Sequence, residues 1–464
     1  MMLLLALLAV TAPFRFHVDG AEFPNVVYNV SCLSDRTPCT KPEIEKFWHD
    51  DLHWTDVDQR QLDAWNAVLD GVGGRAPKPL ESPFLPNIAS YYPGLAAVNR
   101  IIAAGLDSRS PAEFRKRAAT LASANEIEQL SNALQHFQRR LRPWWKSRGE
   151  RYATARRKPI QSLLNAPGVA VVAERIARFM ESGTTGREFR VDLIARNNPQ
   201  SDAAIATFVG NHLLVELIDI MKNPKDAIPV LMHELTHALY ETAPLPLHQK
   251  LIRDFATSSE PQAQALYAIL NEGIATAVQF TLLDSAAEQN DQDTYRHPFI
   301  PRIGRAVSAP LREALENGPT LFHGFLESYL RVCPIELKEE LASPRFILLS
   351  TILFPIGELD EAGKAYHSYI TPIWSASPEN RDRFPEVNIV FLITYDKLDA
   401  IAGNWDEIVP LSQQHRGFAF SSPRNNKGRT YVLAGRDDMT VAEVVKRLAA
   451  IRTRTADGLV LSVD

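Results

Sequence analysis

Cysteine is scarce in this sequence: its 464 residues include only three, Cys32, Cys39 and Cys333. They do not form the closely spaced pairs that bind zinc in cysteine-rich sites. Cys32 and Cys39 bracket the short polar stretch CLSDRTPC, for which two interpretations stay open. They either pair in a disulfide, as an oxidising compartment would allow, or remain two free surface thiols. Cys333 is left over in both cases.

A basic excess is also lacking, since 50 Lys and Arg face 55 Asp and Glu, giving a net charge of −5. Phosphate binding needs a basic surface, so this balance argues against nucleic acid as the main partner. One segment differs: residues 139–158 hold nine basic residues and one Glu around Trp144 and Trp145. A solvated helix face explains it most simply, and a surface for nucleic acid or an anionic envelope is the alternative.

The N-terminal run MMLLLALLAVTAPF carries no charge before Arg15. It is shorter than the roughly 20 residues that a membrane-spanning helix needs, and its apolar core is typical of a secretory signal peptide. No Lys or Arg precedes this core, so a buried N-terminal strand or a misassigned start is the alternative. Ala12, Gly20 and Ala21 offer small residues for cleavage. We predict a signal peptide within residues 1–21, export to the periplasm or the exterior, and no transmembrane segment.

Hydrophobic periodicity after the N-terminus predicts an α+β, mainly helical protein. Residues 22–182 are expected to form a mainly helical N-terminal region. Strand-like patterns at 189–195 and 203–217 precede a helical run from Ala227 to Tyr240, and more helices follow to about residue 370. We assign residues 183–375 to one catalytic domain.

The last 80 residues change character. VNIVFLITY and RTYVLAG read as buried strands, and TVAE at 440–443 is a capping-box start for a helix. These features predict a small C-terminal α/β unit over residues 385–464. The sequence contains no internal repeat and no low-complexity tract.

One carboxylate interrupts a long uncharged stretch. In QALYAILNEGIATAVQF, residues 264–280, Glu272 is the only charged residue between Glu260 and Asp284. The stretch reads as a helix that starts near Ser258 and is buried on most sides. An ionised carboxylate is almost never buried without a partner, because its desolvation is costly. We therefore expect a cation beside Glu272.

The segment VLMHELTHALY, residues 230–240, supplies further ligands for such a cation. It contains H-E-x-x-H, and the four-residue spacing places His233 and His237 on one face of a helix. Zinc binds neutral imidazoles and carboxylates in a tetrahedral arrangement, and catalytic sites keep the fourth position for water. The pattern predicts one Zn²⁺ ion held by His233, His237 and Glu272.

Glu234 is the predicted general base. Its side chain is rotated about 100° around the helix from that of His233, so it lies over the metal instead of binding it. Zinc lowers the pKa of bound water towards about 7, and a nearby carboxylate can take the proton as the water attacks a carbonyl. This combination hydrolyses amide bonds.

HELTH followed by NEGIAT resembles the gluzincins, the thermolysin-like zinc metallopeptidases, over residues 188–285. The resemblance implies a zincin-like core, a peptide or protein substrate, the three ligands above and Glu234 as base. It also implies that the strand before the zinc helix, within 203–217, is an edge strand that pairs with the substrate backbone. Thermolysin-like enzymes often carry an Asp four residues after the glutamate ligand, and this sequence has Thr276 there.

The resemblance further implies a Tyr or His that stabilises the oxyanion of the transition state. Our preferred candidate is Tyr366, and the others are His367, Tyr369, His323 and Tyr329. Two further functions stay open: a zinc hydrolase of non-peptide amides, and a catalytically silent zincin-fold binding protein. The sequence does not indicate an oligomeric state.

Overall fold

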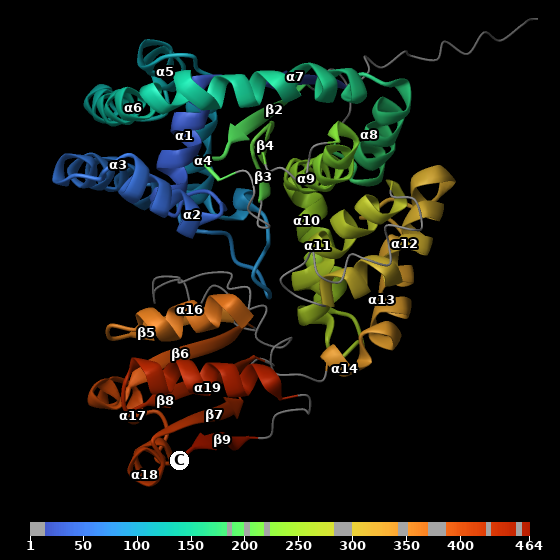
Figure 1. Ribbon diagram of the computed structural model, residues 1–464. Coiled ribbons are helices and arrows are strands. Elements are labelled where there is room, and N and C mark those ends of the chain that lie inside the picture. The colour runs from blue at the N-terminus through green and yellow to red at the C-terminus, as the bar shows by residue number, and fades with distance from the viewer. Residues whose placement is uncertain are drawn as a thin grey trace, which may run out of the picture.

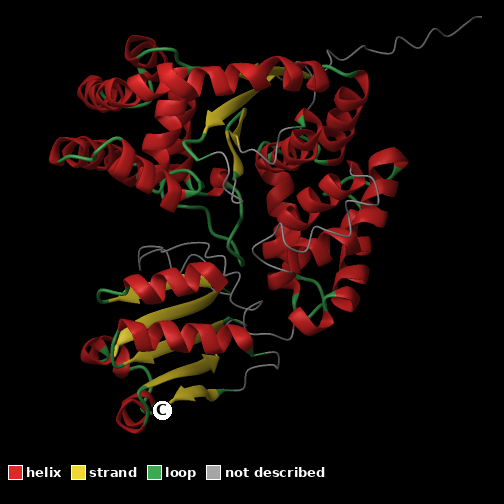
Figure 2. Cartoon of the chain, viewed as in Figure 1, coloured by secondary structure: helices red, strands yellow, loops and turns green. Residues whose placement is uncertain are grey.

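The structure is a computed structural model. It describes residues 14–182, 188–198, 205–217, 223–282, 299–341, 351–369, 387–423, 428–451 and 457–464. The fold is α+β and mainly helical, as predicted, with two separate sheets (Figures 1 and 2). Most of the predicted signal peptide, residues 1–13, lies outside the described residues. Among the described helices, none combines the length and apolar character needed to cross a membrane.

The first sheet has four strands in the order β1-β2-β4-β3. The strands β1 (Arg15–Asp19), β2 (Glu188–Ala195) and β4 (His212–Leu217) run parallel. The fourth strand, β3 (Ala206–Val209), is antiparallel to β4 and is an edge strand. Gly210 turns the chain from β3 into β4 with a φ of +61°, a conformation that glycine adopts without strain. The strand expected at 189–195 is confirmed, and the described part of the further strand expected at 203–217 is a hairpin of β3 and β4.

The other edge of this sheet is formed by β1, in which buried and exposed residues alternate along its first four positions. Phe14, Phe16 and Val18 are buried in the core, and Phe14 stacks on Phe189 of β2. The predicted signal peptide extended to residue 21 and therefore included this strand. Cleavage after Ala21 would remove β1 from the sheet, whereas cleavage after Ala12 would leave it intact.

Helices of the N-terminal region cover one face of the first sheet (Figure 1). Their apolar core surrounds Trp48 and Trp65, and it includes Ile194, Val209 and Leu214 from the sheet. Strands after residue 182 thus share this core with helices that precede it. The elements are α1 (Glu22–Leu33), α2 (Lys41–Lys46), η1 (Phe47–Asp51), α3 (Asp56–Gly74), η2 (Ala89–Tyr91), α4 (Pro93–Leu106), α5 (Pro111–Ala118) and α6 (Ala124–Trp144). Capping boxes begin two of these helices: Thr55 is bonded to Asp58 at the start of α3, and Ser123 to Glu126 at the start of α6.

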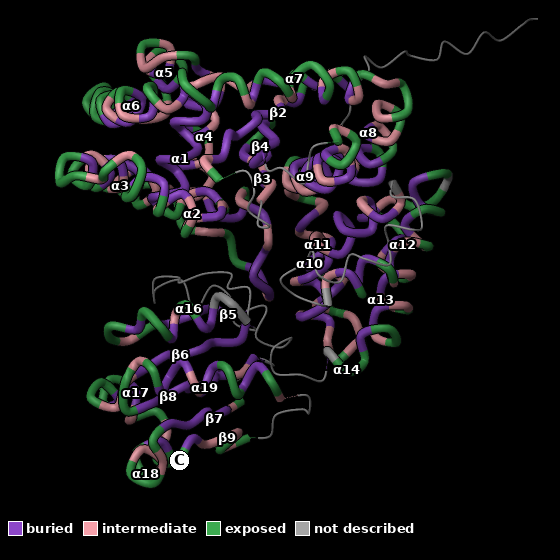
Figure 3. The backbone as a smooth tube through the Cα atoms, in the orientation of Figure 1, coloured by how far each residue is buried: buried purple, intermediate pink, exposed green. Residues whose placement is uncertain are grey.

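A second group of helices forms a larger core that includes β1, β2 and β4. The second group consists of η3 (Trp145–Gly149), α7 (Glu150–Leu164), α8 (Pro167–Phe179), η5 (Pro224–Asp226), α9 (Ala227–Glu241), α10 (Leu245–Ala256), α11 (Ala263–Leu282), α12 (Phe299–Asn317), α13 (Phe325–Glu336) and α14 (Lys338–Leu341). Figure 3 shows that β4 is buried throughout and that β2 and α9 are mostly buried.

The C-terminal unit is built on a five-stranded sheet in the order β5-β6-β8-β7-β9. The predicted strands VNIVFLITY and RTYVLAG are confirmed as β6 and β8. One face packs against α16 and α19, and the other against the short helices α17 and α18. The elements are β5 (Thr351–Ile356), α16 (Asp360–Tyr369), β6 (Asn388–Thr394), η9 (Tyr395–Lys397), α17 (Asp399–Ala402), α18 (Ile408–Gln414), β7 (Gly417–Pro423), β8 (Arg429–Gly435), α19 (Asp438–Ala450) and β9 (Gly458–Val463).

Two predictions about this unit need correction. Its first strand and helix, β5 and α16, precede residue 375, so the unit begins earlier than the predicted residue 385. The helix α19 begins at Asp438 instead of after Thr440. Asp437 is its N-cap, and Oδ1 of Asp437 accepts a hydrogen bond of 2.8 Å from the Thr440 N–H.

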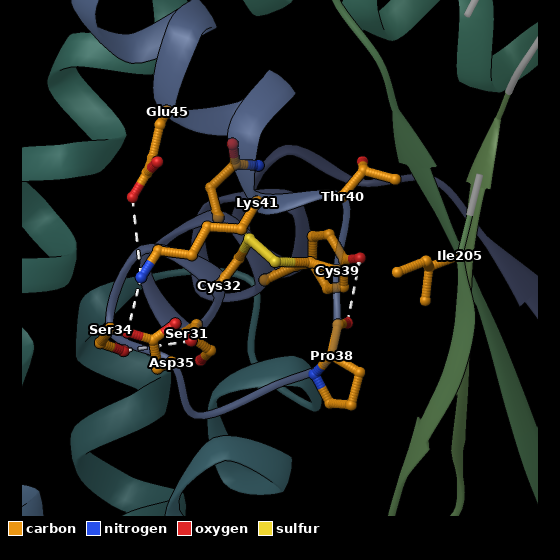
Figure 4. The surroundings of a disulfide bond; sticks show 12 residues. Ser31, Cys32, Ser34, Asp35, Pro38, Cys39, Thr40, Lys41, Glu45 and Ile205 are labelled. Atoms are coloured by element: carbon orange, nitrogen blue, oxygen red, sulfur yellow. Dashed lines mark hydrogen bonds and ion pairs between the residues drawn. A yellow bond between two sulfur atoms is a disulfide. The ribbon is translucent and has the colours of Figure 1, made fainter. Parts of the chain in front are cut away.

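The structure pairs Cys32 with Cys39 in a disulfide, the first of the two interpretations that the sequence left open (Figure 4). Cys333 is free and buried in the larger core. Burial raises the pKa of its thiol to about 12, so it is not a thiolate at neutral pH.

Candidate metal centre

The helix α9 carries the H-E-x-x-H motif, and its position follows from its sequence. Pro224 lies in the turn η5 before it, and the Asn223 side chain accepts a hydrogen bond from the Lys225 N–H. Eleven of the 15 residues of α9 are buried, as the apolar composition of the helix requires. The helical prediction from Ala227 to Tyr240 is confirmed to within one residue.

The helix α11 packs beside α9 and carries Glu272. It begins at Ala263, a few residues after the start expected near Ser258. Most of the helix is buried, but Asn271 and Glu272 are partly exposed, and the Glu272 side chain has 36% exposure. We expected this carboxylate on a helix buried on most sides, and its exposure leaves the site open to solvent.

The three side chains predicted as ligands converge. The Nε2 atoms of His233 and His237 lie 3.0 Å apart. The Nε2 atom of His233 lies 3.5 Å from Oε1 of Glu272, and the Nε2 atom of His237 lies 3.3 Å from Oε2. Within the described ranges, no other set of three such side chains brings its ligand atoms so close together.

These distances fit a tetrahedral ion. Zinc with nitrogen and oxygen ligands at about 2.0–2.2 Å holds neighbouring ligand atoms about 3.3–3.5 Å apart. The two Nε2 atoms are 3.0 Å apart, and each lies 3.3–3.5 Å from a different oxygen of the Glu272 carboxylate, separations close to this value. Two imidazoles and one carboxylate are also a donor set that zinc favours in catalytic sites. The residues present therefore fit a zinc ion.

Burial and charge shift the two imidazoles in opposite directions. Burial lowers the pKa of His233 to about 4, although the charge of Glu272 opposes this. Burial also acts to lower the pKa of His237, but the carboxylates of Glu272 and Glu234 outweigh it and raise that pKa to about 9. At neutral pH His233 is therefore neutral and His237 carries one positive charge, and a metal ion binding there would displace the extra proton of His237.

Glu234 lies next to His233 in the motif but is not in the group of converging ligand atoms. Its side chain is buried, and burial raises the pKa of its carboxyl to about 7. The charge of His237 acts in the opposite direction. A carboxyl with this pKa can both take and return a proton near neutral pH.

The edge strand β3 borders the site. Phe208 of this strand stacks on the imidazole of His237, with ring centroids 6.2 Å apart and planes inclined by 20°. Ala206 and Phe208 pack against the same core as α9, while Val209 belongs to the core on the other face of the sheet. The sequence prediction did not single out Phe208, although its alternation along the strand with Thr207 and Val209 could have indicated its face.

Two amide side chains of α11 affect the candidate ligands. Asn271 raises the pKa of His237 and Gln279 raises that of His233, each as a smaller effect than those of burial and of Glu272. Thr276 does not replace the missing Asp. It is fully buried, and among the described residues its hydroxyl has no hydrogen-bond partner. A Cβ placed on Gly304 of α12 would lie 2.5 Å from the Thr276 methyl, so this threonine serves helix packing.

Buried hydroxyl groups join the helices below the site. The hydroxyls of Tyr240 on α9 and Tyr267 on α11 both donate to Oδ1 of Asn87, at 2.9 and 3.3 Å. His248 of α10 donates from Nε2 to the carbonyl of Tyr240 at 2.9 Å. These bonds fix α9 relative to α11, and with it the separation of the ligands.

The preferred oxyanion-stabilising residue was predicted wrongly. Tyr366 is buried in the core of the C-terminal unit, and its hydroxyl is bonded to Oγ1 of Thr351 at 2.7 Å. Two of the alternatives are also engaged elsewhere: His323 contacts Glu181, and the Tyr329 hydroxyl donates to the Leu266 carbonyl. The side chains of the remaining candidates, His367 and Tyr369, lie outside the described part of the chain.

Comparisons of this chain with family models, with curated proteins and with solved structures found no match. The candidate metal centre therefore stands on its own geometry: two imidazoles and a carboxylate from two packed helices, with a buried glutamate next to His233.

Proposed function

We propose that this chain is a zinc-dependent metallopeptidase with a zincin-like core made of the first sheet, α9 and α11. The observation that carries the proposal is the convergence of His233, His237 and Glu272: the two Nε2 atoms lie 3.0 Å apart, and each lies 3.3–3.5 Å from one of the two carboxylate oxygens. One zinc ion is the expected cofactor, and a peptide or protein is the expected substrate. A bound zinc ion supplies Lewis acidity, which activates water and polarises a carbonyl group.

The chain's own residues account for the remaining chemistry. Glu234 takes the proton of the attacking water and passes it to the departing amine, for which its pKa of about 7 is well suited. The outer edge of β3 offers backbone groups that no described strand pairs, and an extended peptide can add there as a further strand. Phe208 and His237 would then lie under the bound peptide.

Export remains part of the proposal. The apolar N-terminal run motivates it, and the Cys32–Cys39 disulfide supports it, because disulfides persist in oxidising compartments. Cleavage near Ala12 is the version of this proposal that keeps β1 in the sheet.

The proposal is tested by metal analysis and a peptide-library digest on the purified full chain. We expect about one zinc per chain, loss of zinc in His237→Ala, and cleavage of peptides that a chelator stops and added zinc restores. His415→Ala is a matched control, since His415 lies in the C-terminal unit and contacts Asp464. Equal zinc content in His237→Ala and the parent would reject the metal site. Zinc without peptide cleavage would leave a non-peptide amide hydrolase or a silent binding protein.

A further inference from the structure

The carboxylate of Glu216 is fully buried at the end of β4, and five donors surround it. Its Oε1 accepts from the hydroxyl of Tyr28 at 2.7 Å and from the N–H of Thr40 at 3.1 Å. Its Oε2 accepts from the Thr40 hydroxyl at 2.7 Å, from the Ile205 N–H at 3.2 Å and from the Arg196 guanidinium. Hydrogen bonds to a charged acceptor are the strong ones, so this group is a rigid anchor.

The bond to Ile205 links this anchor to the edge strand. Ile205 directly precedes β3, and its carbonyl accepts the Glu216 N–H at 3.2 Å as part of the strand pairing. Its own N–H turns to the Glu216 carboxylate, which extends the β3–β4 pairing by one residue. The strand β3 has only four residues and one neighbouring described strand, so this bond helps to fix its N-terminal end, together with the packing of β3 on α9.

The disulfide holds the donors of this anchor in place. Thr40 directly follows Cys39, which is bonded to Cys32 seven residues earlier. Cys32 lies in α1, the helix that also carries Tyr28, so the disulfide fixes Thr40 relative to Tyr28. Ile205 is among the residues that surround the disulfide (Figure 4). The Thr40 side chain makes no capping bond to α2, and its hydroxyl is used for Glu216 instead.

We propose that Glu216 is a positioning residue for substrate binding, held by the disulfide-closed loop that ends at Thr40. This inference rests on the proposed function, in which the outer edge of β3 pairs with the peptide backbone. When donors to Glu216 are lost, β3 must be ordered each time a peptide binds. That cost falls equally on the bound substrate and the transition state, so KM rises while kcat stays the same.

Two mild variants test the anchor without leaving a buried charge unpaired. Tyr28→Phe and Thr40→Val each remove one hydroxyl donor and keep the Glu216–Arg196 ion pair. Thr40→Ser restores the hydroxyl and is expected to behave as the parent. Tyr366→Phe is the matched control, because it removes a buried hydroxyl bond of the same 2.7 Å length in the C-terminal unit.

Three quantities are measured: zinc content, KM and kcat for a peptide taken from the library digest, and amide hydrogen exchange. For the double variant Tyr28→Phe/Thr40→Val we expect KM to rise about three- to tenfold, with kcat within about twofold of the parent. Exchange should become faster at residues 205–209 and stay unchanged in β2. Zinc content should stay at the parental level.

The possible results separate this inference from the proposed function. If the folded double variant keeps the parental KM and the parental exchange at residues 205–209, the positioning role is rejected. If zinc, kcat and KM all deteriorate together, Glu216 is merely part of the general fold and the inference is again wrong. If the parent itself cleaves no peptide, the proposed function fails, and faster exchange at β3 would show that only the anchor is real. Should the double variant not fold, Cys32→Ser/Cys39→Ser is measured in its place, with the same expected results.

Discussion

Phe208 and His237 stack their rings at a centroid distance of 6.2 Å, which joins the edge strand β3 to the candidate metal ligands. A strand position and a helix position thus meet beside the candidate ligands, where we propose that a peptide binds. Phe208 is partly buried, so part of its ring is available to a substrate side chain. In the proposed function, this contact brings β3 and the motif helix to the same substrate.

Phe208→Ala is expected to weaken peptide binding more than it slows the reaction. The substitution removes apolar surface that a substrate side chain can cover, but it leaves all three candidate ligands and Glu234 in place. Burying one large apolar group is worth about 1.5–3 kcal/mol, so a loss of part of it should raise KM about three- to thirtyfold. Phe208→Leu should show a smaller rise. An unchanged KM across the library peptides would mean that Phe208 does not face the substrate.

His248 makes stability depend on pH. It is fully buried between Tyr240 and Phe322, and burial lowers its pKa to about 4, although the Tyr240 carbonyl opposes this. An unfolded histidine has a pKa near 6.5 and so binds a proton at a higher pH than the folded one. The contribution of His248 to the free energy of unfolding is therefore fully present above pH 6.5, and it decreases as the pH falls from 6.5 towards 4.

His248→Gln should remove this part of the pH dependence, since the amide can still donate to the Tyr240 carbonyl but does not titrate. Between pH 7 and pH 5 the parent should lose about 2 kcal/mol more unfolding free energy than the variant. Urea unfolding at the two pH values measures the difference. His136→Gln is a control, because that histidine contacts Asp58 in the other core. If the unfolding free energy of the parent and of His248→Gln changed equally between the two pH values, His248 would not be the source of the pH dependence.

The local features of the site were predictable from the sequence. The four-residue spacing in HELTH fixes the face that His233 and His237 share on any helix. The lone carboxylate at Glu272 pointed to a partner elsewhere, and α11 does bring it to the two imidazoles. The strands β2, β6 and β8 were recognised from patterns that lie within single segments.

What depends on contacts between distant segments was not predictable. Nothing near Phe16 in the sequence indicates that it pairs with Phe189 in a sheet. This pairing shows that the folded part of the chain begins before residue 21, where the predicted signal peptide ended. Tyr366 is on a helix as expected, but β5 pairs with β6 and so places that helix in another unit. The roles of Asn271 and Gln279 also depend on how closely α11 packs against α9, which no local pattern encodes.

The position of signal-peptide cleavage can be predicted from the sheet. Removal of β1 would expose the edge of β2 and the apolar side chains that pack on Phe16 and Val18. We therefore expect export with cleavage before Phe14, close to Ala12. Mass spectrometry of the N-terminal peptide from exported protein checks this directly. A mature chain that starts after Ala21 would contradict the role of β1, and an intact Met1 on cytoplasmic protein would contradict export.

Glu234→Gln separates an enzyme from a silent zinc-binding fold. The amide keeps the size of the side chain but cannot take a proton from water, and general-base assistance is worth about 10²–10⁴ in rate. The kcat should fall by at least that factor while zinc content stays at the parental level, because Glu234 is not in the group of converging ligand atoms. Glu241→Gln is the control, since Glu241 ends the same helix and binds the Ser90 N–H. Parental rates in Glu234→Gln would place the chemistry elsewhere, and a loss of zinc would mean that Glu234 is a ligand instead of a base.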